Sequence, residues 1–86
     1  MTGSAGLAAM TLDELPHSGR AVVTRLDATG AERRRLMDLG VLPGVTVTAE
    51  ATSPLGDPTA YRIRGAVIAL RRAQARLIRV VSQPAP

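Results

Sequence analysis

Hydrophobic and polar positions change their period several times along this chain. Residues 20–26 (RAVVTRL) are rich in β-branched side chains, which favours a strand. Residues 45–52 alternate strictly, with Val and Ala on one face and Thr and Glu on the other, and they predict the clearest strand of the chain. Further strands are predicted at AYRIRG (60–65), VIAL (67–70) and LIRVV (77–81). Five short strands in about 70 residues indicate a mainly β domain.

One helix is predicted between the first and second of these strands. The segment AERRRLMDL consists of good helix formers, and Leu36 and Leu39 share one face of it. Gly40 stands where a left-handed residue ends a helix, and Val41 is placed to contact Leu36 in a Schellman motif. The Pro-Gly pair that follows cannot continue the helix. The pattern therefore predicts a short helix that stops sharply and leads into the next strand.

The remaining segments complete a small barrel. Thr11 and Glu14 form a capping-box pattern, which predicts a short helical turn before the first strand. SPLGDP (53–58) is a proline-restricted loop, and RRAQA (71–75) fits one helical turn. We expect one domain over residues 11–82, with tails at 1–10 and 83–86. A partly open barrel of SH3-like type accommodates five strands and one inserted helix, and closing the sheet covers strand edges.

Length and composition restrict the kind of protein this is. A chain of 86 residues, 45% hydrophobic and 21% charged, can form one folded domain with a modest core and little room for a deep cavity. It lacks an apolar run of the roughly 18–20 residues that span a bilayer, and its first residues lack the positive charge of a signal peptide. With no cysteine, disulfides and thiolate metal sites are excluded. These features fit a cytoplasmic protein.

The basic charge leaves a nucleic-acid-binding SH3-like barrel as an alternative. The net charge is +4, and all eleven basic residues are arginines. Arg62 and Arg64 would share one strand face, and binding of this kind would weaken steeply with salt. The candidate phosphate contacts are Arg62, Arg64, Arg71, Arg72 and Arg79. Tyr61 is the only aromatic residue, however, whereas binders of single strands usually stack bases on several aromatic rings.

Candidate chemistry is sparse. His17 is the only histidine, and no second histidine or cysteine is available to join it as a metal ligand. The glycines of GVLPG lack the lysine and the strand-to-helix setting of a nucleotide cradle. The carboxylates are scattered, and they suggest no catalytic constellation. We therefore expect no catalytic residue, no metal site and no cofactor, and a protein that is not an enzyme.

The helix and its end carry the candidate binding site. Three consecutive helical arginines fan around roughly 200° of the surface, which argues against one focused phosphate grip. Leu36 and Leu39 are expected to fill the barrel mouth. Exposed methionine and aliphatic side chains often mark a protein-binding surface, and so small a domain cannot bury all those at the helix end. The candidate partner-binding residues are Arg33, Met37, Leu39, Val41 and Leu42. The same apolar helix end could also pair weakly with a second copy of the chain.

Three segments together resemble the FeoA family. The opening segment of the family is similar to LDELPHSGRAVVTRL (12–26). Its arginine–leucine helix with Leu-Gly and Pro-Gly is similar to RRRLMDLGVLPGVTV (33–47), and its closing strands are similar to GAVIALRRAQARLIRV (65–80). The resemblance covers about residues 11–81 and implies an SH3-like fold. It also implies a small cytosolic accessory protein of ferrous iron uptake that docks on the GTPase part of the FeoB membrane transporter, at the inner face of the membrane. A related domain ends iron-dependent repressors, but this chain has no room for their winged helix, so we expect a free-standing role.

Overall fold

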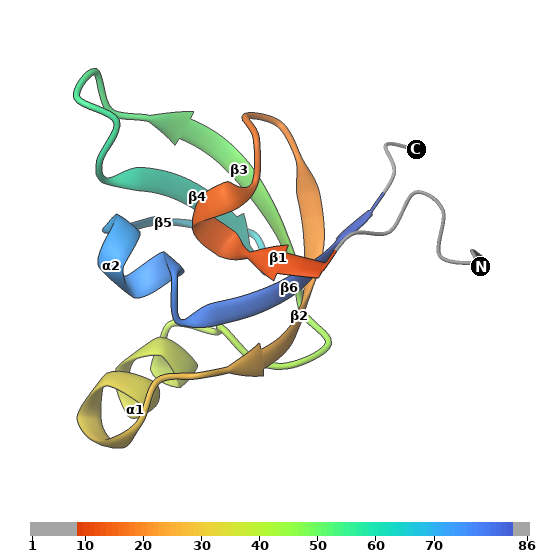
Figure 1. Ribbon diagram of the computed structural model, residues 1–86, viewed down its shortest axis with the longest axis vertical. Coiled ribbons are helices and arrows are strands. Elements are labelled where there is room, and N and C mark those ends of the chain that lie inside the picture. The colour runs from red at the N-terminus through yellow and green to blue at the C-terminus, as the bar shows by residue number, and fades with distance from the viewer. Residues whose placement is uncertain (1–8, 84–86) are drawn as a thin grey trace.

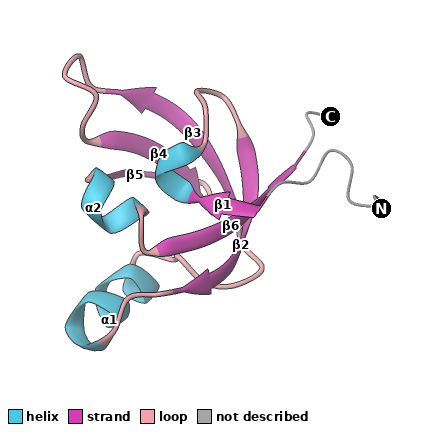
Figure 2. Cartoon of the chain, viewed as in Figure 1, coloured by secondary structure: helices cyan, strands magenta, loops and turns pink. Residues whose placement is uncertain are grey.

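The computed structural model describes residues 9–83, in which six strands form one antiparallel sheet (Figure 2). The strands are β1 (Ala9–Thr11), β2 (Arg20–Leu26), β3 (Thr46–Thr52), β4 (Thr59–Ile63), β5 (Ala66–Leu70) and β6 (Ile78–Gln83). The helices are the 3₁₀ turn η1 (Leu12–Glu14), α1 (Gly30–Asp38) and α2 (Arg72–Ala75). The strand order is β1-β6-β2-β3-β4-β5, so β1 and β5 are the two edges of the sheet. The prediction of a mainly β domain with one helix after the strand at 20–26 is confirmed.

The sheet curls around a single hydrophobic core. Figure 1 shows α1 at one end of the molecule and the loop between β3 and β4 at the opposite end. In the central strands alternate side chains point inward, as strand geometry requires, and the helices contribute Leu12, Leu36 and Ala75 to the core. The largest fully buried side chains are Leu12, Leu36, Ile63, Leu70, Ile78, Val23, Val41, Val47 and Val80. Because both α1 and the chain just after it contribute to this set, the core fixes the helix end in place.

The two ends of the sequence contain more strand than the pattern indicated. Residues 9–11 pair with β6, with Met10 opposite Val80, and β6 continues to Gln83. Residues 9, 10 and 83, which the sequence analysis assigned to the tails at 1–10 and 83–86, therefore belong to strands. Residues 1–8 and 84–86 lie outside the described part. Val80 is 1% exposed and Met10 packs against the core. Residues 9–11 form a strand because they pair with β6, which is far away in the sequence. The sequence pattern did not predict this strand, because three residues are too few to show a period of two.

The alternation predicted over residues 45–52 breaks at Glu50. Val47 and Ala49 are buried as expected, but the register of β3 against β4 shifts between Ala49 and Ala51. A β-bulge of this kind reverses the direction in which later side chains point. Ala51 is consequently exposed, although the sequence placed it on the buried face.

The end of α1 is a Schellman motif, as the sequence predicted. The N–H of Gly40 donates to the carbonyl of Met37 at 3.0 Å, and the N–H of Val41 donates to that of Leu36 at 3.0 Å. Gly40 has a φ of 96°, which side chains with a Cβ rarely adopt. The helix is therefore stopped at a defined residue.

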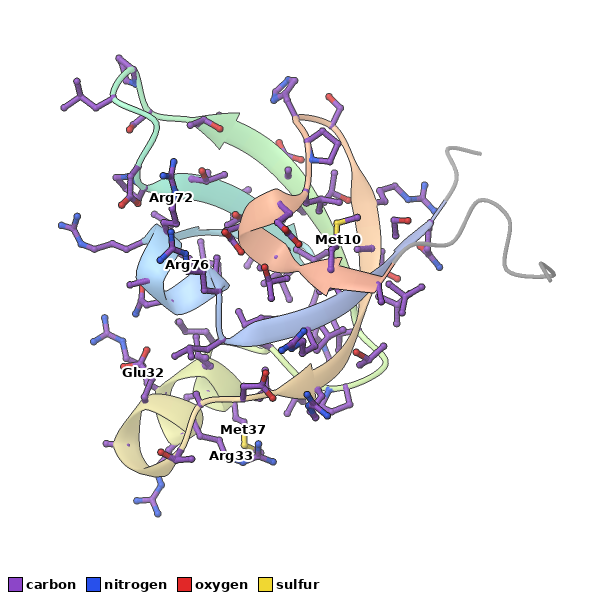
Figure 3. The ribbon with its side chains drawn as sticks, in the orientation of Figure 1. Met10, Glu32, Arg33, Met37, Arg72 and Arg76 are labelled. Carbon is purple, nitrogen blue, oxygen red and sulfur yellow. The ribbon has the colours of Figure 1, made fainter. Side chains whose placement is uncertain are left out.

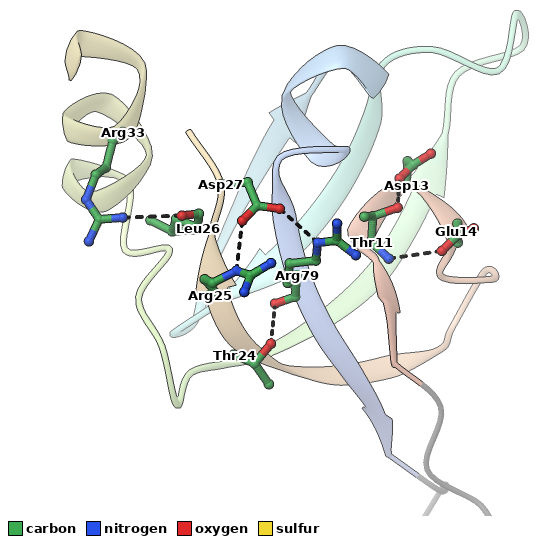
Figure 4. Close-up of polar contacts among 9 residues, drawn as sticks. All are labelled: Thr11, Asp13, Glu14, Thr24, Arg25, Leu26, Asp27, Arg33 and Arg79. Carbon is green, nitrogen blue, oxygen red and sulfur yellow. Dashed lines mark hydrogen bonds and ion pairs between the residues drawn. The ribbon is translucent and has the colours of Figure 1, made fainter. Parts of the chain in front are cut away.

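The short turn η1 is anchored in the core of the sheet through Leu12. The N–H of Thr11 donates to Oε1 of Glu14 at 3.0 Å, which confirms that half of the predicted capping box (Figure 4). Leu12 is fully buried, and its carbonyl accepts a hydrogen bond of 3.4 Å from the hydroxyl of Tyr61. Burial raises the pKa of Tyr61 above its ordinary value of 10.0. The only aromatic ring of the chain is thus a core residue.

Candidate partner-binding surface

Exposed apolar side chains gather where α1 ends. Met37 and Leu39 are each 38% exposed, which is high for large hydrophobic residues, and Leu42 is half-buried. We call Met37, Leu39 and Leu42 the helix-end surface. Figure 3 shows Met37 beside Arg33, as expected of residues four apart on a helix. Three of the predicted partner-binding side chains therefore reach solvent in one short stretch of chain.

Two expectations for this stretch were wrong. Val41 was predicted to be a partner-binding residue, but it is fully buried because the Schellman turn directs it against Leu36. Leu39 was expected to fill the barrel mouth, but it follows the last helical residue and lies on the surface. Leu36 does occupy the core as expected. The helix period places Leu36 and Leu39 on one face, whereas the turn that starts at Leu39 separates them.

The three arginines before this surface behave differently from one another. Arg33 is exposed, yet its Nη1 donates to the carbonyl of Leu26 at 3.4 Å, which draws its side chain back towards β2 (Figure 4). Arg34 and Arg35 are exposed and take part in no ion pair among residues 9–83. All three arginines are exposed, and Arg34 and Arg35 add positive charge to the helix that leads to the helix-end surface.

Arg64, in the turn between β4 and β5, also borders the helix end. A Cβ placed on Gly40 would lie 3.6 Å from Cδ of Arg64 and 3.7 Å from Cγ2 of Ile63. The turn is therefore packed against the chain just after α1. The sequence did not indicate this contact, because the two segments are brought together only by the curl of the sheet.

A carboxylate between two arginines fastens the end of β2 to β6. Asp27 accepts a hydrogen bond of 2.8 Å from Nε of Arg79 and another of 2.8 Å from Nε of Arg25 (Figure 4). These two bonds lower the pKa of Asp27 below its ordinary value of 3.8, and the bond from Arg79 has the larger effect. Arg79, one of the candidate phosphate contacts, is consequently engaged within the chain.

The arginine-rich strand face proposed for nucleic acid is not continuous. Arg62 forms an ion pair of 3.0 Å with Glu50, and Nη2 of Arg72 donates to the carbonyl of Gly56 at 3.4 Å. Arg64 lies outside β4 with a φ of 52°, so the prediction that it shares a strand face with Arg62 was wrong. Arg71 is exposed at the start of α2. The five arginines therefore do not line up as one strip of free cations.

Cavities and metal-binding groups add little to this surface. A hollow of about 350 Å³ lies between β1, β2 and β6, and a hollow of about 200 Å³ lies beside η1 and Tyr61. Within residues 9–83, no three His, Asp or Glu side chains stand close enough to share a metal ion, and His17 is exposed. No helix in the same range is long and apolar enough to cross a bilayer. The absence of a ferrous site, of a cofactor and of enzymatic activity stays a prediction.

The curled sheet, with a helix after β2 and a short turn before β6, defines a small SH3-like β domain. The chain belongs to the FeoA family, since residues 10–82 match the FeoA domain. This family is associated with ferrous iron transport and consists of transport accessory proteins. The resemblance and the SH3-like fold predicted from the sequence are thereby confirmed.

Individual relatives agree with this assignment. The FeoA protein of Chlorobium tepidum is 41% identical, with a TM-score of 0.79 over 88% of this chain and 71% of that one. FeoA of Stenotrophomonas maltophilia, described as a prokaryotic SH3 domain protein and solved with zinc, is 33% identical, with a TM-score of 0.75 over 88% of this chain and 99% of that one. A Fe(2+) transport protein A/Fe(2+) transporter FeoB fusion protein of Porphyromonas gingivalis is 38% identical over 71 residues, which are 83% of this chain and 8% of the fusion.

Proposed function

We propose that this protein assists ferrous iron uptake by binding the cytosolic GTPase part of a FeoB-type transporter, and that the helix-end surface makes the contact. One observation carries the proposal. In the relative from Porphyromonas gingivalis, a domain like this chain is fused to the transporter FeoB in a single polypeptide. Fusion holds two proteins at high effective concentration, which is useful when they act together. A FeoA-like domain that is not fused to the transporter needs a binding surface to obtain the same proximity.

The helix-end surface has the properties of such a site. Met37 and Leu39 offer exposed apolar area, and methionine adapts its shape to a partner. The Schellman hydrogen bonds hold these residues in a fixed geometry, so little conformational freedom is lost on binding. Arg34 and Arg35 precede this surface on α1, and Arg64 lies beside Gly40. These three arginines outnumber Asp38, the exposed carboxylate between Met37 and Leu39. The complementary patch on the transporter should therefore be apolar at its centre and acidic at its rim.

In this function the protein acts by contact and not by catalysis. The iron is cargo of the transporter, and the chain contributes no ligand to it. Binding places the protein in the cytoplasm at the inner face of the membrane. A second copy of the chain is the competing occupant of the helix-end surface, because an apolar patch can be self-complementary.

The test is a titration of the purified cytosolic domain of the same organism's FeoB with this protein and its variants. Met37→Glu and Leu39→Glu should each weaken binding at least about tenfold, because a charge would be buried at the centre of the contact. Leu55→Glu is the matched control, since Leu55 is 93% exposed in the loop at the opposite end of the molecule (Figure 1). It should bind as the unchanged protein does, and all three variants should melt at nearly the same temperature.

Three results would contradict the proposal. If the unchanged protein does not bind the transporter domain, the proposed function is wrong. If Met37→Glu binds normally while Leu55→Glu does not, the contact lies at the other end of the molecule. If the protein forms a dimer that Met37→Glu dissociates, and binds no transporter domain, the helix-end surface serves self-association.

A further inference from the structure

The outer edge of β5 is an unpaired and unprotected strand edge. β5 consists of the five residues AVIAL, pairs with β4 on one side, and is last in the strand order. We propose that this edge binds an extended peptide segment with acidic flanks, which adds to the sheet as a further strand. This interaction uses backbone groups of β5 and none of the three residues of the helix-end surface, although Arg64 borders both sites.

The geometry of the preceding turn shows which groups are free. Arg64 and Gly65 have φ values of 52° and 84°, the pattern of a type I′ turn that joins Ile63 directly to Ala66. In such a hairpin the flanking pair is hydrogen-bonded, and hydrogen-bonded and non-bonded pairs then alternate. The N–H and C=O groups of Val67 and Ala69 accordingly point away from β4. They form a row of donors and acceptors along the open edge.

No hydrogen bond within residues 9–83 occupies this row. Apart from the ladder with β4, residues 66–70 take part in no backbone or side-chain hydrogen bond in that part of the chain. Proteins usually protect an edge strand with an inward charge, a proline or a bulge, and β5 has none of these. Val67 is 51% exposed, and Ala66 and Ala69 are exposed as well. An unprotected edge of this kind is the template that strand addition uses.

Positive charge stands at both ends of the edge. Arg64 precedes β5 and Arg71 follows it, and neither guanidinium forms an ion pair among the described residues. β5 itself carries no charge, and the only carboxylate linked to its far end is Asp57, which accepts from the N–H of Arg72 at 2.9 Å. A segment that lies along the edge would therefore gain from a carboxylate near each end.

The same charges argue against a second copy of this chain as the occupant. An antiparallel pair of β5 strands centred on Ile68 would bring the turn that contains Arg64 in each copy towards the start of α2, at Arg72, in the other copy. Like charges brought together at both ends of the pairing would repel each other. The net charge of +4 adds a general repulsion between copies. The occupant is better matched by a segment with β-branched residues at its centre and acidic residues separated by about 23 Å, the span of seven strand residues.

The experiment uses the full chain and two synthetic probes. The acidic probe is the acetylated and amidated peptide Glu-Glu-Thr-Val-Thr-Val-Thr-Glu-Glu, and the basic probe carries Lys in place of each Glu. Binding of the acidic probe should slow hydrogen exchange of the Val67 and Ala69 amides and leave that of Met37 unchanged. The basic probe should bind at least about tenfold more weakly.

A pair of variants isolates the backbone contact. Ala69→Pro removes one outward N–H, which an edge strand tolerates without loss of its bonds to β4, and should weaken binding of the acidic probe about tenfold. Ala69→Thr keeps the N–H at the same position and should bind as the unchanged chain does. Arg71→Glu should reduce the preference for the acidic probe.

Several results would overturn this inference. The inference is wrong if the acidic probe does not bind, or if it binds Ala69→Pro and Ala69→Thr equally well. It is also wrong if the probe slows hydrogen exchange of amides outside β5. Probe binding only after deletion of residues 1–8 would assign the edge to the chain's own N-terminal segment. A dimer that Ala69→Pro dissociates would assign it to a second copy. Loss of transporter binding by Met37→Glu has no bearing on these results, so the two proposals fail separately.

Discussion

The N–H of Val41 donates to the carbonyl of Leu36 at 3.0 Å, and both side chains are completely buried. This single link closes the end of α1 and inserts two aliphatic side chains into the core from opposite sides of a turn. The residues between them, Met37 and Leu39 among others, are thereby turned outward. The same turn therefore combines the burial of Leu36 and Val41 with the exposure of the helix-end surface.

Replacing Leu36 separates the structural residues of this segment from the surface ones. Leu36→Ala should lower the free energy of unfolding by about 2–5 kcal/mol, because it removes a fully buried side chain and leaves a cavity. Met37→Ala, one position along, should change it by about 0.5 kcal/mol or less. Urea denaturation of both variants measures the difference. Equal losses would mean that Met37 is packed in the core as firmly as Leu36.

The backbone of Gly40 provides a second test of the helix stop. Gly40→Ala should lower the free energy of unfolding by about 1–2 kcal/mol, since its φ of 96° is unfavourable for any residue with a Cβ. Collision is not the cause, because the new Cβ would meet Cδ of Arg64 only at 3.6 Å, an ordinary contact. Gly40→Asn is the control: asparagine tolerates the left-handed region better and should lose less. A larger loss for Asn than for Ala would contradict this explanation.

Much of this fold could be predicted because local signals agree with tertiary structure. The strand at 20–26 matches β2, the Schellman end of α1 was indicated by Gly40 and Val41, and the strand at 77–81 overlaps β6. What the sequence missed depends on pairing across the sheet. β1 exists because it pairs with β6, and the bulge after Ala49 exists because β3 must follow β4 around the curl. Neither leaves a local period.

The candidate site was predictable in part for the same reason. Met37 and Leu42 were predicted to be exposed because the chain has more apolar residues at the helix end than so small a core can bury. Counting apolar residues is enough for this prediction. Val41 was misplaced because its apolar character does not indicate which way a turn directs it. The packing of Arg64 against Gly40, and the unpaired edge of β5, arise from the strand order, which the sequence pattern did not supply.

The hydroxyl of Tyr61 offers a test of the contact between the sheet and η1. Tyr61→Phe should lower the free energy of unfolding at neutral pH by about 0.5–1.5 kcal/mol, because the carbonyl of Leu12 loses its 3.4 Å hydrogen bond. The raised pKa of Tyr61 adds a second signature. Above pH 10.0 the hydroxyl of Tyr61 loses its proton more readily in the unfolded chain than in the folded one. The free energy of unfolding of the unchanged protein should therefore fall as pH rises, and Tyr61→Phe should lack this part of the fall. Parallel alkaline profiles would show that the ring is not held as described.

The carboxylate of Asp27 should make stability depend on acid pH. Its pKa lies below the ordinary 3.8 because Arg79 and Arg25 hydrogen-bond the charged form, so its contribution is complete above 3.8 and disappears as pH falls through the folded pKa. Asp27→Asn should therefore melt below the unchanged protein at neutral pH, and the two should converge in strong acid. High salt should reduce the difference, since the pairs reach solvent. Asp38→Asn, at an exposed carboxylate that has no ion pair among residues 9–83, is the control. A gap for Asp27→Asn that stays constant down to strong acid would contradict the role assigned to this carboxylate.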